Sequence, residues 1–202
     1  MLEPKKGIVT FRAEGNNIKN SPYYSRVIHW PESVKTCSSL NERSGVTIGR
    51  GYDMRHRTRD AIIRDLRTAG VPLEQANKIS LGSKLHNCNA ASFVLKNRNE
   101  IGEITEDQQN RLFNLTYPKY EIDAKKFYEK YRRSNSPLWD ELNIKLRDIF
   151  VDMKYQGVLK RVYVLTFEKN NINDVIDLME SSQEIMQYEN GRNRVKYLKD
   201  RE

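Results

Sequence analysis

The chain has 202 residues, of which 38% are hydrophobic and 31% are charged, and its mean hydropathy is −0.78. This size suits one domain, or one domain built of two lobes around enough apolar residues for a core. No run approaches the roughly eighteen apolar residues of a membrane span, which excludes membrane insertion through a helix. The first residues also lack the apolar stretch and cleavage site of a secretory signal, so export would need another route.

The net charge of +8 and the pI near 9.4 predict an anionic partner. Nucleic acid, an anionic membrane and a bacterial cell wall would all attract such a chain. The sequence shows no helix-turn-helix, zinc-finger or RNA-binding motif, which disfavours nucleic acid. Charge alone predicts attraction and leaves the identity of the partner open.

The two cysteines and three histidines are scattered. Cys37 and Cys88 form no CxxC motif, so they either make one disulfide or stay reduced as small buried groups. His29, His56 and His86 show no metal-ligand spacing around them. The sequence therefore predicts neither a metal site nor an organic cofactor.

In chain order, residues 1–58 come first and are rich in Asn, Ser, Gly and Tyr, with little helical periodicity. Their one β signal is SGVTIGRGYD at residues 44–53. There, Val46, Thr47 and Ile48 are β-branched and glycines flank the run. The segment predicts a small hairpin or short sheet.

From Thr58 onward the pattern turns helical. Thr58 can cap a helix that Gly70 ends, and Pro72 suits the first turn of the next helix. Thr105 and Gln108 form a capping-box pair at the start of a third.

Further helical stripes follow to the C-terminus, with a loop after the first of them. The helical stretches are 120–131, 138–156 ending before Gly157, 158–168, 173–180 and roughly 182–199, and the loop is 132–137. We interpret the stripes as core-facing helix surfaces. The predicted fold class is α+β, with a small β-containing lobe at residues 1–58, a larger helical lobe at residues 59–202 and a cleft between them.

Glu14 is a candidate catalytic acid. It follows Ile8, Val9 and Phe11, and Gly15 after it permits close approach of another chain or a substrate. Glycoside hydrolysis needs a carboxylic acid for the leaving oxygen and a second group for water or the cationic sugar. A partly desolvated carboxyl with a raised pKa suits the first task. Taken alone, a glutamate near a helix end is more often a solvated surface residue.

Two segments together carry a specific resemblance. AEG at 13–15 and SGVTIGRGYD at 44–53 resemble the active-site signature of the pesticin-like and phage-type lysozyme family. In that family a Glu–Gly pair ends the first helix, and a glycine-bounded TIGxG strand supplies a threonine. Pesticin-like members place an aspartate six residues later, which is the separation of Thr47 and Asp53 here. HWP at 29–31 is similar to the branch associated with type VI secretion effectors.

The resemblance extends weakly toward the C-terminus. MKYQG at 153–157 resembles the helix end at the centre of the family's second lobe. NRVKYL at 193–198 is similar to a late Asn–Arg helix whose arginine approaches the catalytic glutamate. Arg194 would take that place near the substrate, and its alternative is a plain surface charge.

The resemblance implies a role for each site residue. Glu14 would be the general acid, Thr47 would hold the attacking water through its hydroxyl, and Asp53 would activate that water or stabilise the sugar cation. We favour inversion, which needs carboxyl groups about 6.5–9.5 Å apart, over retention, which needs about 5–5.5 Å. Phage lysozymes usually place the second carboxylate before the threonine, so Glu32 and Glu42 are rivals of Asp53.

Each of these residues also has a structural interpretation. Thr47 can be only a strand residue, and Asp53 can be a cap or turn residue where the chain leaves the hairpin. Tyr52 and Trp30 are candidate substrate-binding rings, because aromatic rings stack on sugars, or else packing residues.

The resemblance implies an N-acetylmuramidase that cleaves the β-1,4 bond between N-acetylmuramic acid and N-acetylglucosamine in peptidoglycan. A chitin-type substrate stays open. The enzyme would be an antibacterial toxin, secreted or injected, that acts as a monomer in the periplasm of a target bacterium. Its implied partners are the glycan strands, an immunity protein and a secretion-system carrier, and the chain would be the C-terminal part of a longer effector or a whole protein. The alternative is a non-catalytic wall-binding module on a lysozyme scaffold.

Overall fold

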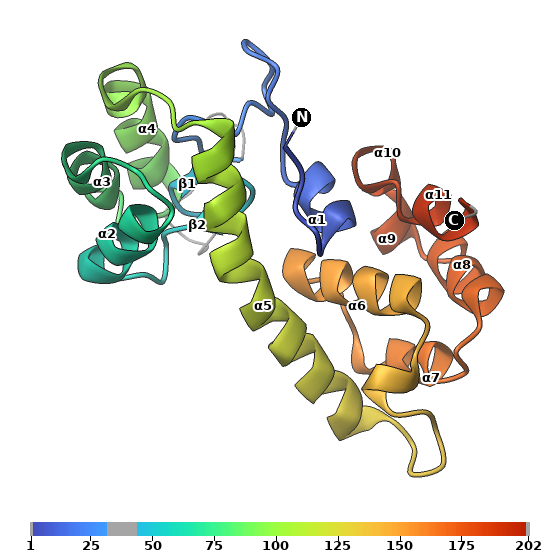
Figure 1. Ribbon diagram of the computed structural model, residues 1–202. Coiled ribbons are helices and arrows are strands. Elements are labelled where there is room, and N and C mark those ends of the chain that lie inside the picture. The colour runs from blue at the N-terminus through green and yellow to red at the C-terminus, as the bar shows by residue number, and fades with distance from the viewer. Residues whose placement is uncertain (1, 32–43, 201–202) are drawn as a thin grey trace. The chain divides into compact units, whose positions relative to one another are not determined.

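The computed structural model describes residues 2–31 and 44–200. The chain is mostly helical with one small two-stranded antiparallel sheet in this part, which confirms the α+β class (Figure 1). It folds into two compact units. The first unit comprises residues 1–4 and 14–116, and the second comprises 5–13 and 117–202.

This division differs from the expected one at residue 58. The helices that follow Thr58 belong to the first unit together with the sheet. The first helix, α1 (Ile8–Ala13), belongs to the second unit, where it contacts α6 (Ile144–Gln156) and α10 (Glu189–Arg192). The expected boundary rested on composition, whereas the observed one reflects which apolar surfaces cover each other.

The sheet of the first unit is the predicted hairpin. Strand β1 (Thr47–Ile48) pairs with β2 (Tyr52–Asp53) in antiparallel register, so that Thr47 faces Asp53 and Ile48 faces Tyr52. The turn between them contains Gly49 at φ +62° and Gly51 at φ +76°, backbone conformations that favour glycine. The glycines of the TIGRG segment are thus what makes the tight connection possible.

Helices surround this sheet in the first unit (Figure 1). They are α2 (Arg59–Thr68), α3 (Leu73–Ser80), α4 (Asn87–Ile101) and the first part of α5 (Glu106–Tyr131). The predicted cap of α2 is confirmed, because the Thr58 hydroxyl accepts a hydrogen bond from the Ala61 amide at 3.3 Å. Gly70 follows its end at φ +89°. Pro72 immediately precedes α3 and is not its first residue.

The capping box at the start of α5 is also confirmed. The Thr105 amide donates to Gln108 Oε1 at 2.8 Å, and the Gln108 amide donates to Thr105 Oγ1 at 3.1 Å. The helix then runs through Pro118 to Tyr131, so the stripe at 120–131 is part of it.

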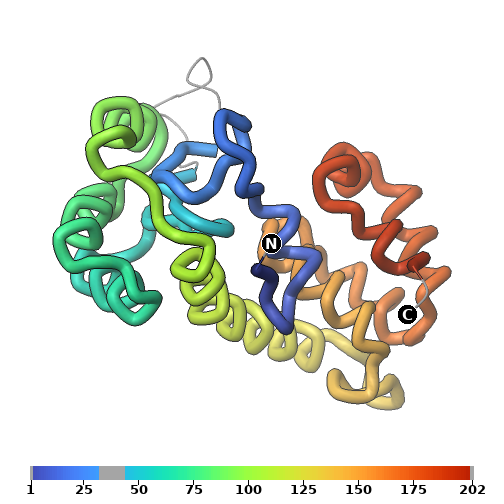
Figure 2. Tube along the Cα trace, turned by 45° about the horizontal axis from the view of Figure 1, so that its top comes forward, coloured from blue at the N-terminus to red at the C-terminus, as the bar shows by residue number. Residues whose placement is uncertain are grey.

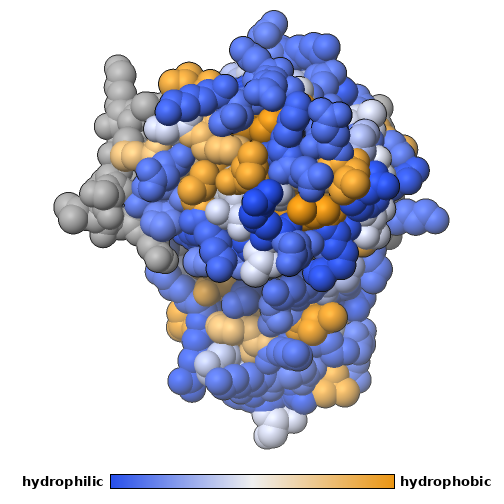
Figure 3. Space-filling model, turned by 90° about the vertical axis from the view of Figure 1, so that its left-hand side faces the viewer, coloured by the Kyte–Doolittle hydropathy of each residue, from blue (hydrophilic) through white to orange (hydrophobic). Residues whose placement is uncertain are grey.

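The core of the first unit lies between one face of the sheet and these helices. Its fully buried members include Ile28, Val46, Ile48, Ile62 and Leu66. On the face drawn in Figure 3, hydrophobic residues form patches among hydrophilic ones.

The second unit is built of helices, which Figure 2 follows in order along the chain. Besides α1, α6, α10 and the rest of α5, these are α7 (Val164–Phe167), α8 (Ile172–Glu180), α9 (Gln183–Met186) and α11 (Arg194–Lys199). Its core centres on Phe150, whose ring lies 4.9 Å from that of Phe167, 5.6 Å from that of Trp139 and 5.8 Å from that of Tyr128. Aromatic packing therefore holds α5, α6 and α7 together.

Three predicted boundaries in the second unit were wrong. The helix expected from residue 138 begins only at Ile144, because a 3-10 turn at Trp139–Glu141 precedes the cap residue Asn143. Residues 158–168 are helical only from the 3-10 turn at 161 onward. The stretch 182–199 is three short helices, and Asn193 interrupts it with φ +53°.

Among the helices of residues 2–31 and 44–200, none has the length and apolar character to cross a membrane.

Candidate functional site

The hairpin is widened on one side by a third backbone segment. His29 and Thr47 form an antiparallel bridge, in which the His29 amide donates to the Thr47 carbonyl at 2.8 Å and the Thr47 amide donates to the His29 carbonyl at 2.9 Å. Thr47 also faces Asp53 across the hairpin. Directly opposed residues on neighbouring strands point to the same side of a sheet. His29, Thr47 and Asp53 therefore form one row on one face, which we call the polar row.

The opposite face is apolar, which supports this assignment. Ile28, Val46, Ile48, Tyr52 and Met54 alternate with the members of the polar row along the three segments and are all buried in the core. Alternation in a strand sends neighbours to opposite sides. The polar row thus lies on the face that turns away from this core.

Thr47 occupies the middle of the row and is 5% exposed. Its hydroxyl donates to the Gly45 carbonyl at 3.2 Å, which fixes the side chain and leaves the oxygen able to accept a hydrogen bond. Opposed side chains of this kind have Cβ atoms about 4.5–5.5 Å apart. The side chains of Thr47 and Asp53 are therefore direct neighbours across the hairpin.

Asp53 is partly exposed, and the backbone fixes its carboxylate. Oδ1 accepts from the Arg55 amide at 2.7 Å, and Oδ2 accepts from the Gly45 amide at 3.3 Å. A Cβ added at Gly45 would lie 2.6 Å from Oδ1, so only glycine fits there. Asp53 thus has the turn-capping role expected as its structural alternative, and each oxygen keeps a further lone pair for water.

Glu14 is partly exposed and directly follows α1, as the resemblance implies for the Glu–Gly pair. Gly15 lies against a neighbouring segment, where an added Cβ would be 2.8 Å from Ser25 Cβ and 2.9 Å from the Tyr23 carbonyl oxygen. Asn16 is bound to the same segment, by its amide to the Tyr23 carbonyl at 2.8 Å and by its carbonyl to the Ser25 amide at 3.1 Å. The chain that leaves Glu14 is therefore held firmly.

A buried network joins this segment to the turn of the hairpin. Arg50, 2% exposed, donates to Asn17 Oδ1 at 3.3 Å, and Gln109 donates to the same oxygen at 2.9 Å. The Ser25 hydroxyl donates to Gln109 Oε1 at 2.7 Å, and the Ser25 carbonyl accepts from the Gly49 amide at 2.7 Å. Sequence reasoning missed these residues, although Arg50 is a charged residue inside the apolar TIGRG segment.

Arg50 also connects Glu14 to this network through charge. Burial lowers the pKa of Arg50 to about 10, against the opposing effect of Glu106, Glu3 and Glu14. The Glu14 carboxylate therefore lies within electrostatic range of a guanidinium that belongs to the hairpin turn. The structure thus brings the Glu14 segment, Thr47 and Asp53 into one hydrogen-bonded part of the first unit.

Tyr52 and Trp30, the two rings predicted to bind substrate, differ from each other in burial and contacts. Tyr52 is 1% exposed, its hydroxyl donates to Asp65 at 2.8 Å, and the Arg57 guanidinium lies 4.2 Å from its ring centre. Burial raises the pKa of Tyr52. This placement is that of a core residue and does not fit the predicted substrate contact. Trp30 packs partly against the core and donates from Nε1 to the Ser44 carbonyl at 2.8 Å.

Arg194 is also buried, in the second unit, and is not the surface charge considered as its alternative. It is 0% exposed and binds Asp152 at 2.6 Å, and it donates to Gln156 as well. Arg192 binds the other oxygen of Asp152 at 2.7 Å. Burial lowers the pKa of Arg194, while Asp152 opposes the change. Such an interior ion cluster does not fit the predicted substrate contact. The rival carboxylates Glu32 and Glu42 lie outside the described residues.

Cys88 takes part in a disulfide, and no described cysteine is free. The other cysteine of the chain, Cys37, lies outside the described residues. Groups of His, Cys, Asp and Glu suited to a metal ion are absent from residues 2–31 and 44–200.

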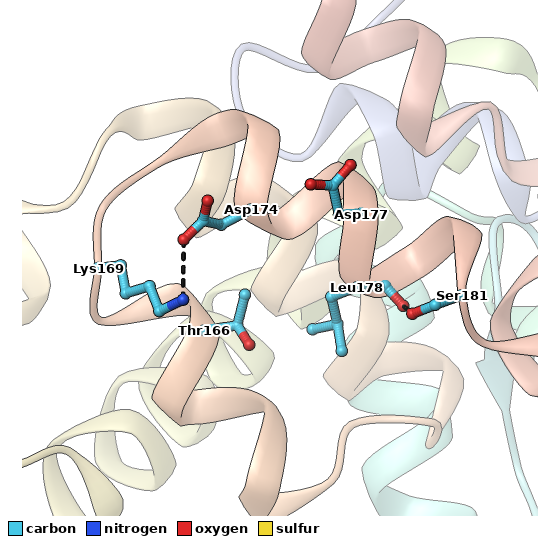
Figure 4. A pocket seen from close by; sticks show the side chains of 6 residues that line it. All are labelled: Thr166, Lys169, Asp174, Asp177, Leu178 and Ser181. Carbon is cyan, nitrogen blue, oxygen red and sulfur yellow. Dashed lines mark hydrogen bonds and ion pairs between the residues drawn. The ribbon is translucent and has the colours of Figure 1, made fainter.

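Each unit also has a shallow hollow on its surface. One, of about 380 Å³ in the second unit, has Lys169 paired with Asp174 at 3.0 Å at its edge (Figure 4). Its lining is Thr166, Lys169, Asp174, Asp177, Leu178 and Ser181. The other, of about 230 Å³, lies beside α3 in the first unit. Neither contains a residue of the predicted site.

No curated protein matches the chain. A family model described as "Domain of unknown function (DUF8812)" matches residues 7–196, which span almost the whole length and include Glu14, the polar row and Arg194. The chain therefore belongs to the DUF8812 family.

Proposed function

We propose that the chain is a lysozyme-like N-acetylmuramidase that cleaves peptidoglycan, with Glu14 as its general acid. One observation carries this proposal. Thr47 and Asp53 oppose each other on the polar row, and hydrogen bonds through residues 23–25 connect their hairpin to the segment that starts at Glu14. Two carboxyl groups are the usual requirement for hydrolysis of a glycosidic bond, and the Thr47 hydroxyl adds a group that can hold water.

In the proposed reaction, Glu14 gives its proton to the glycosidic oxygen while the bond from that oxygen to the anomeric carbon breaks. A water molecule held at the Thr47 hydroxyl forms the new bond to this carbon and loses a proton to a base of the polar row. The Asp53 carboxylate stabilises the positive charge that develops on the sugar. The hydrogen bonds from Arg55 and Gly45 keep this carboxylate in a fixed orientation without reorganisation.

The charge of the chain supports the choice of substrate. Peptidoglycan carries peptide carboxylates, which attract a protein with a net charge of +8. Arg55, Arg57 and Arg59 immediately follow β2 and place positive charge beside the hairpin. We extend the proposal to an antibacterial toxin delivered to the periplasm of a target cell, with an immunity protein in its producer.

The test is digestion of purified sacculi by the wild-type chain and by Glu14→Gln. The substitution keeps the shape of the side chain and removes its acidic proton, so release of fragments should fall by at least about 100-fold. Glu106→Gln is the matched control, because Glu106 also lies in the electrostatic surroundings of Arg50 and should be dispensable. Full activity of Glu14→Gln would rule out the mechanism.

Product analysis separates the remaining possibilities. Mass spectrometry should find fragments that end in reducing N-acetylmuramic acid, which glucosaminidases, amidases and lytic transglycosylases do not produce. Sedimentation with sacculi without any release of fragments would instead favour a wall-binding module. The configuration of the first product, read by NMR, distinguishes inversion from retention.

A further inference from the structure

The third member of the polar row is His29, which the resemblance to lysozymes assigns no role. Its backbone exchanges two hydrogen bonds with Thr47, so its side chain stands directly beside that of Thr47, on the opposite side from Asp53. Its neighbours Ile28 and Trp30 point toward the core, which confirms by alternation that His29 points away from it.

The hydrogen bonding of His29 defines which nitrogen can accept a proton. Nδ1 lies 3.0 Å from the Val27 carbonyl oxygen. Because a carbonyl can only accept, Nδ1 must carry the hydrogen, and in the neutral ring Nε2 then has the free lone pair. The carbonyl therefore selects the tautomer that a base needs.

The surroundings of the ring favour its neutral form. Burial lowers the pKa of His29 below its ordinary value of 6.5, Arg98 on α4 lowers it further, and the bond to Val27 opposes the change. Asp53 is the carboxylate of the row and is separated from His29 by Thr47. A neutral imidazole beside the water-holding hydroxyl is thus present at neutral pH.

Asp53 is less suited to the same task. Both of its carboxylate oxygens already accept backbone hydrogen bonds, from Arg55 and Gly45, that hold the hairpin together. Protonation of this carboxylate would weaken both bonds, whereas protonation of Nε2 would leave the bond from Nδ1 to Val27 intact.

We propose that His29 Nε2 accepts the proton of the water molecule that Thr47 positions, and that Asp53 stabilises the positive charges of the sugar and of the imidazolium. This inference rests on the proposed muramidase function. In the step, the water oxygen bonds to the anomeric carbon, its proton passes to Nε2, and the leaving oxygen takes the proton of Glu14. The imidazolium afterwards releases its proton to solvent, and Glu14 regains one.

The first experiment compares His29→Gln with His86→Gln in the digestion of sacculi. His86 is a matched control, because it also bridges the hairpin region, through Gly45, and has Nδ1 3.3 Å from a carbonyl two residues earlier. His29→Gln should lower kcat about 100-fold and abolish the fall of kcat at acidic pH, since a protonated imidazole cannot act as base. His86→Gln should behave like the wild type.

Chemical rescue distinguishes a base from a merely structural residue. Added imidazole should restore a measurable part of the activity of His29→Ala at pH values where free imidazole is neutral, and should not affect Glu14→Gln. An unchanged rate and pH profile in His29→Gln, while Glu14→Gln is inactive, would overturn the role of His29 and leave the muramidase proposal intact. An active Glu14→Gln variant would instead defeat the muramidase proposal.

A measurement on a chain that keeps His29 covers the case in which the variants do not fold. In His56→Gln/His86→Gln, His29 is the only histidine left of the three. Diethylpyrocarbonate, which acylates neutral imidazole, should inactivate this double variant, and bound glycan fragments should protect it. Retention of full activity after complete modification of His29 would overturn the proposal.

Discussion

Charged side chains serve different purposes in the two units of this protein. In the second unit, Asp152 lies between Arg192 and Arg194 with both carboxylate oxygens engaged by guanidinium groups, and Asp152 and Arg194 are fully buried. In the first unit, Asp53 is held by backbone amides, remains partly exposed and has an uncharged neighbour, Thr47. The arginines around Asp152 neutralise its charge, whereas the backbone amides around Asp53 leave its carboxylate able to accept hydrogen bonds from another molecule.

Burial alone does not identify a functional carboxylate. Asp152 is more buried than Asp53, but its bonds to two arginines leave it little capacity for chemistry. We therefore expect substitutions in the Asp152 cluster to act on stability and substitutions in the polar row to act on activity.

The largest effect on stability should come from Asp152→Asn. The change leaves the buried Arg194 without its charged partner, which typically costs about 3–5 kcal/mol of unfolding free energy. Thermal and denaturant unfolding measure it. Asp140→Asn, which removes an exposed carboxylate paired with Lys125, is the control and should change little. Equal losses in the two variants would contradict the distinction.

Thr47→Val should separate activity from stability. Loss of the hydroxyl removes the proposed water ligand, and kcat should fall about 100-fold, or near 2.7 kcal/mol of barrier. The lost bond to Gly45 should cost only about 1 kcal/mol of stability. Thr10→Val in the second unit is the matched control, since the buried Thr10 hydroxyl has no hydrogen-bond partner among the described residues and its removal should be harmless. A Thr47→Val variant with normal kcat would remove Thr47 from the mechanism.

Gly7→Ala tests the packing of the second unit without altering charge. Gly7 has φ +70°, and a Cβ there would lie 2.4 Å from the Tyr117 ring, so left-handed strain and overlap together should cost about 2–4 kcal/mol. Gly157→Ala provides the comparison, because Gly157 has φ +85° but open space around it. Gly157→Ala should lower the free energy of unfolding by only about 1–2 kcal/mol, because only the backbone is strained. Similar unfolding midpoints for the two variants would contradict the prediction, because they would mean that the Tyr117 ring moves aside at little cost.

The smallest effect concerns Asp148 and depends on pH. Burial raises the pKa of this carboxyl, although Tyr197 donates a hydrogen bond to it. A raised pKa in the folded state means that ionised Asp148 costs stability, and that this cost disappears as the pH falls through the raised pKa. Asp148→Asn should therefore be stabilised relative to the wild type at pH 7, by an amount that shrinks toward acidic pH. A difference in melting temperature that is constant with pH would contradict the assignment.

Local chemistry made part of the fold predictable. The caps at Thr58 and Thr105 and the hairpin around its glycines depend on neighbouring residues, and all three are present. The helical stretch expected at roughly 182–199 is interrupted at Asn193, which adopts a left-handed conformation that asparagine tolerates better than most residues. Apolar periodicity does not report such interruptions.

In the site too, features that depend on neighbouring residues were predictable, and contacts between distant segments were not. The pairing of Thr47 with Asp53 follows from a short turn, and the burial of Tyr52 follows from its position one residue before Asp53, which places it on the other face. Alternation could have corrected the prediction for Tyr52. Two contacts join residues that are distant in sequence, and no local sequence pattern predicts them. They are the bridge between His29 and Thr47 and the hydrogen bond from Arg50 to Asn17.

The membership of α1 in the second unit has a consequence for biosynthesis. Residues 14–116 form nearly all of the first unit and emerge from the ribosome as one uninterrupted stretch, so this unit can acquire its structure early. Helix α1 emerges before them but must await α6 and α10, which are synthesised later than the whole first unit. A nascent chain would thus carry a complete hairpin while α1 still lacked its permanent neighbours.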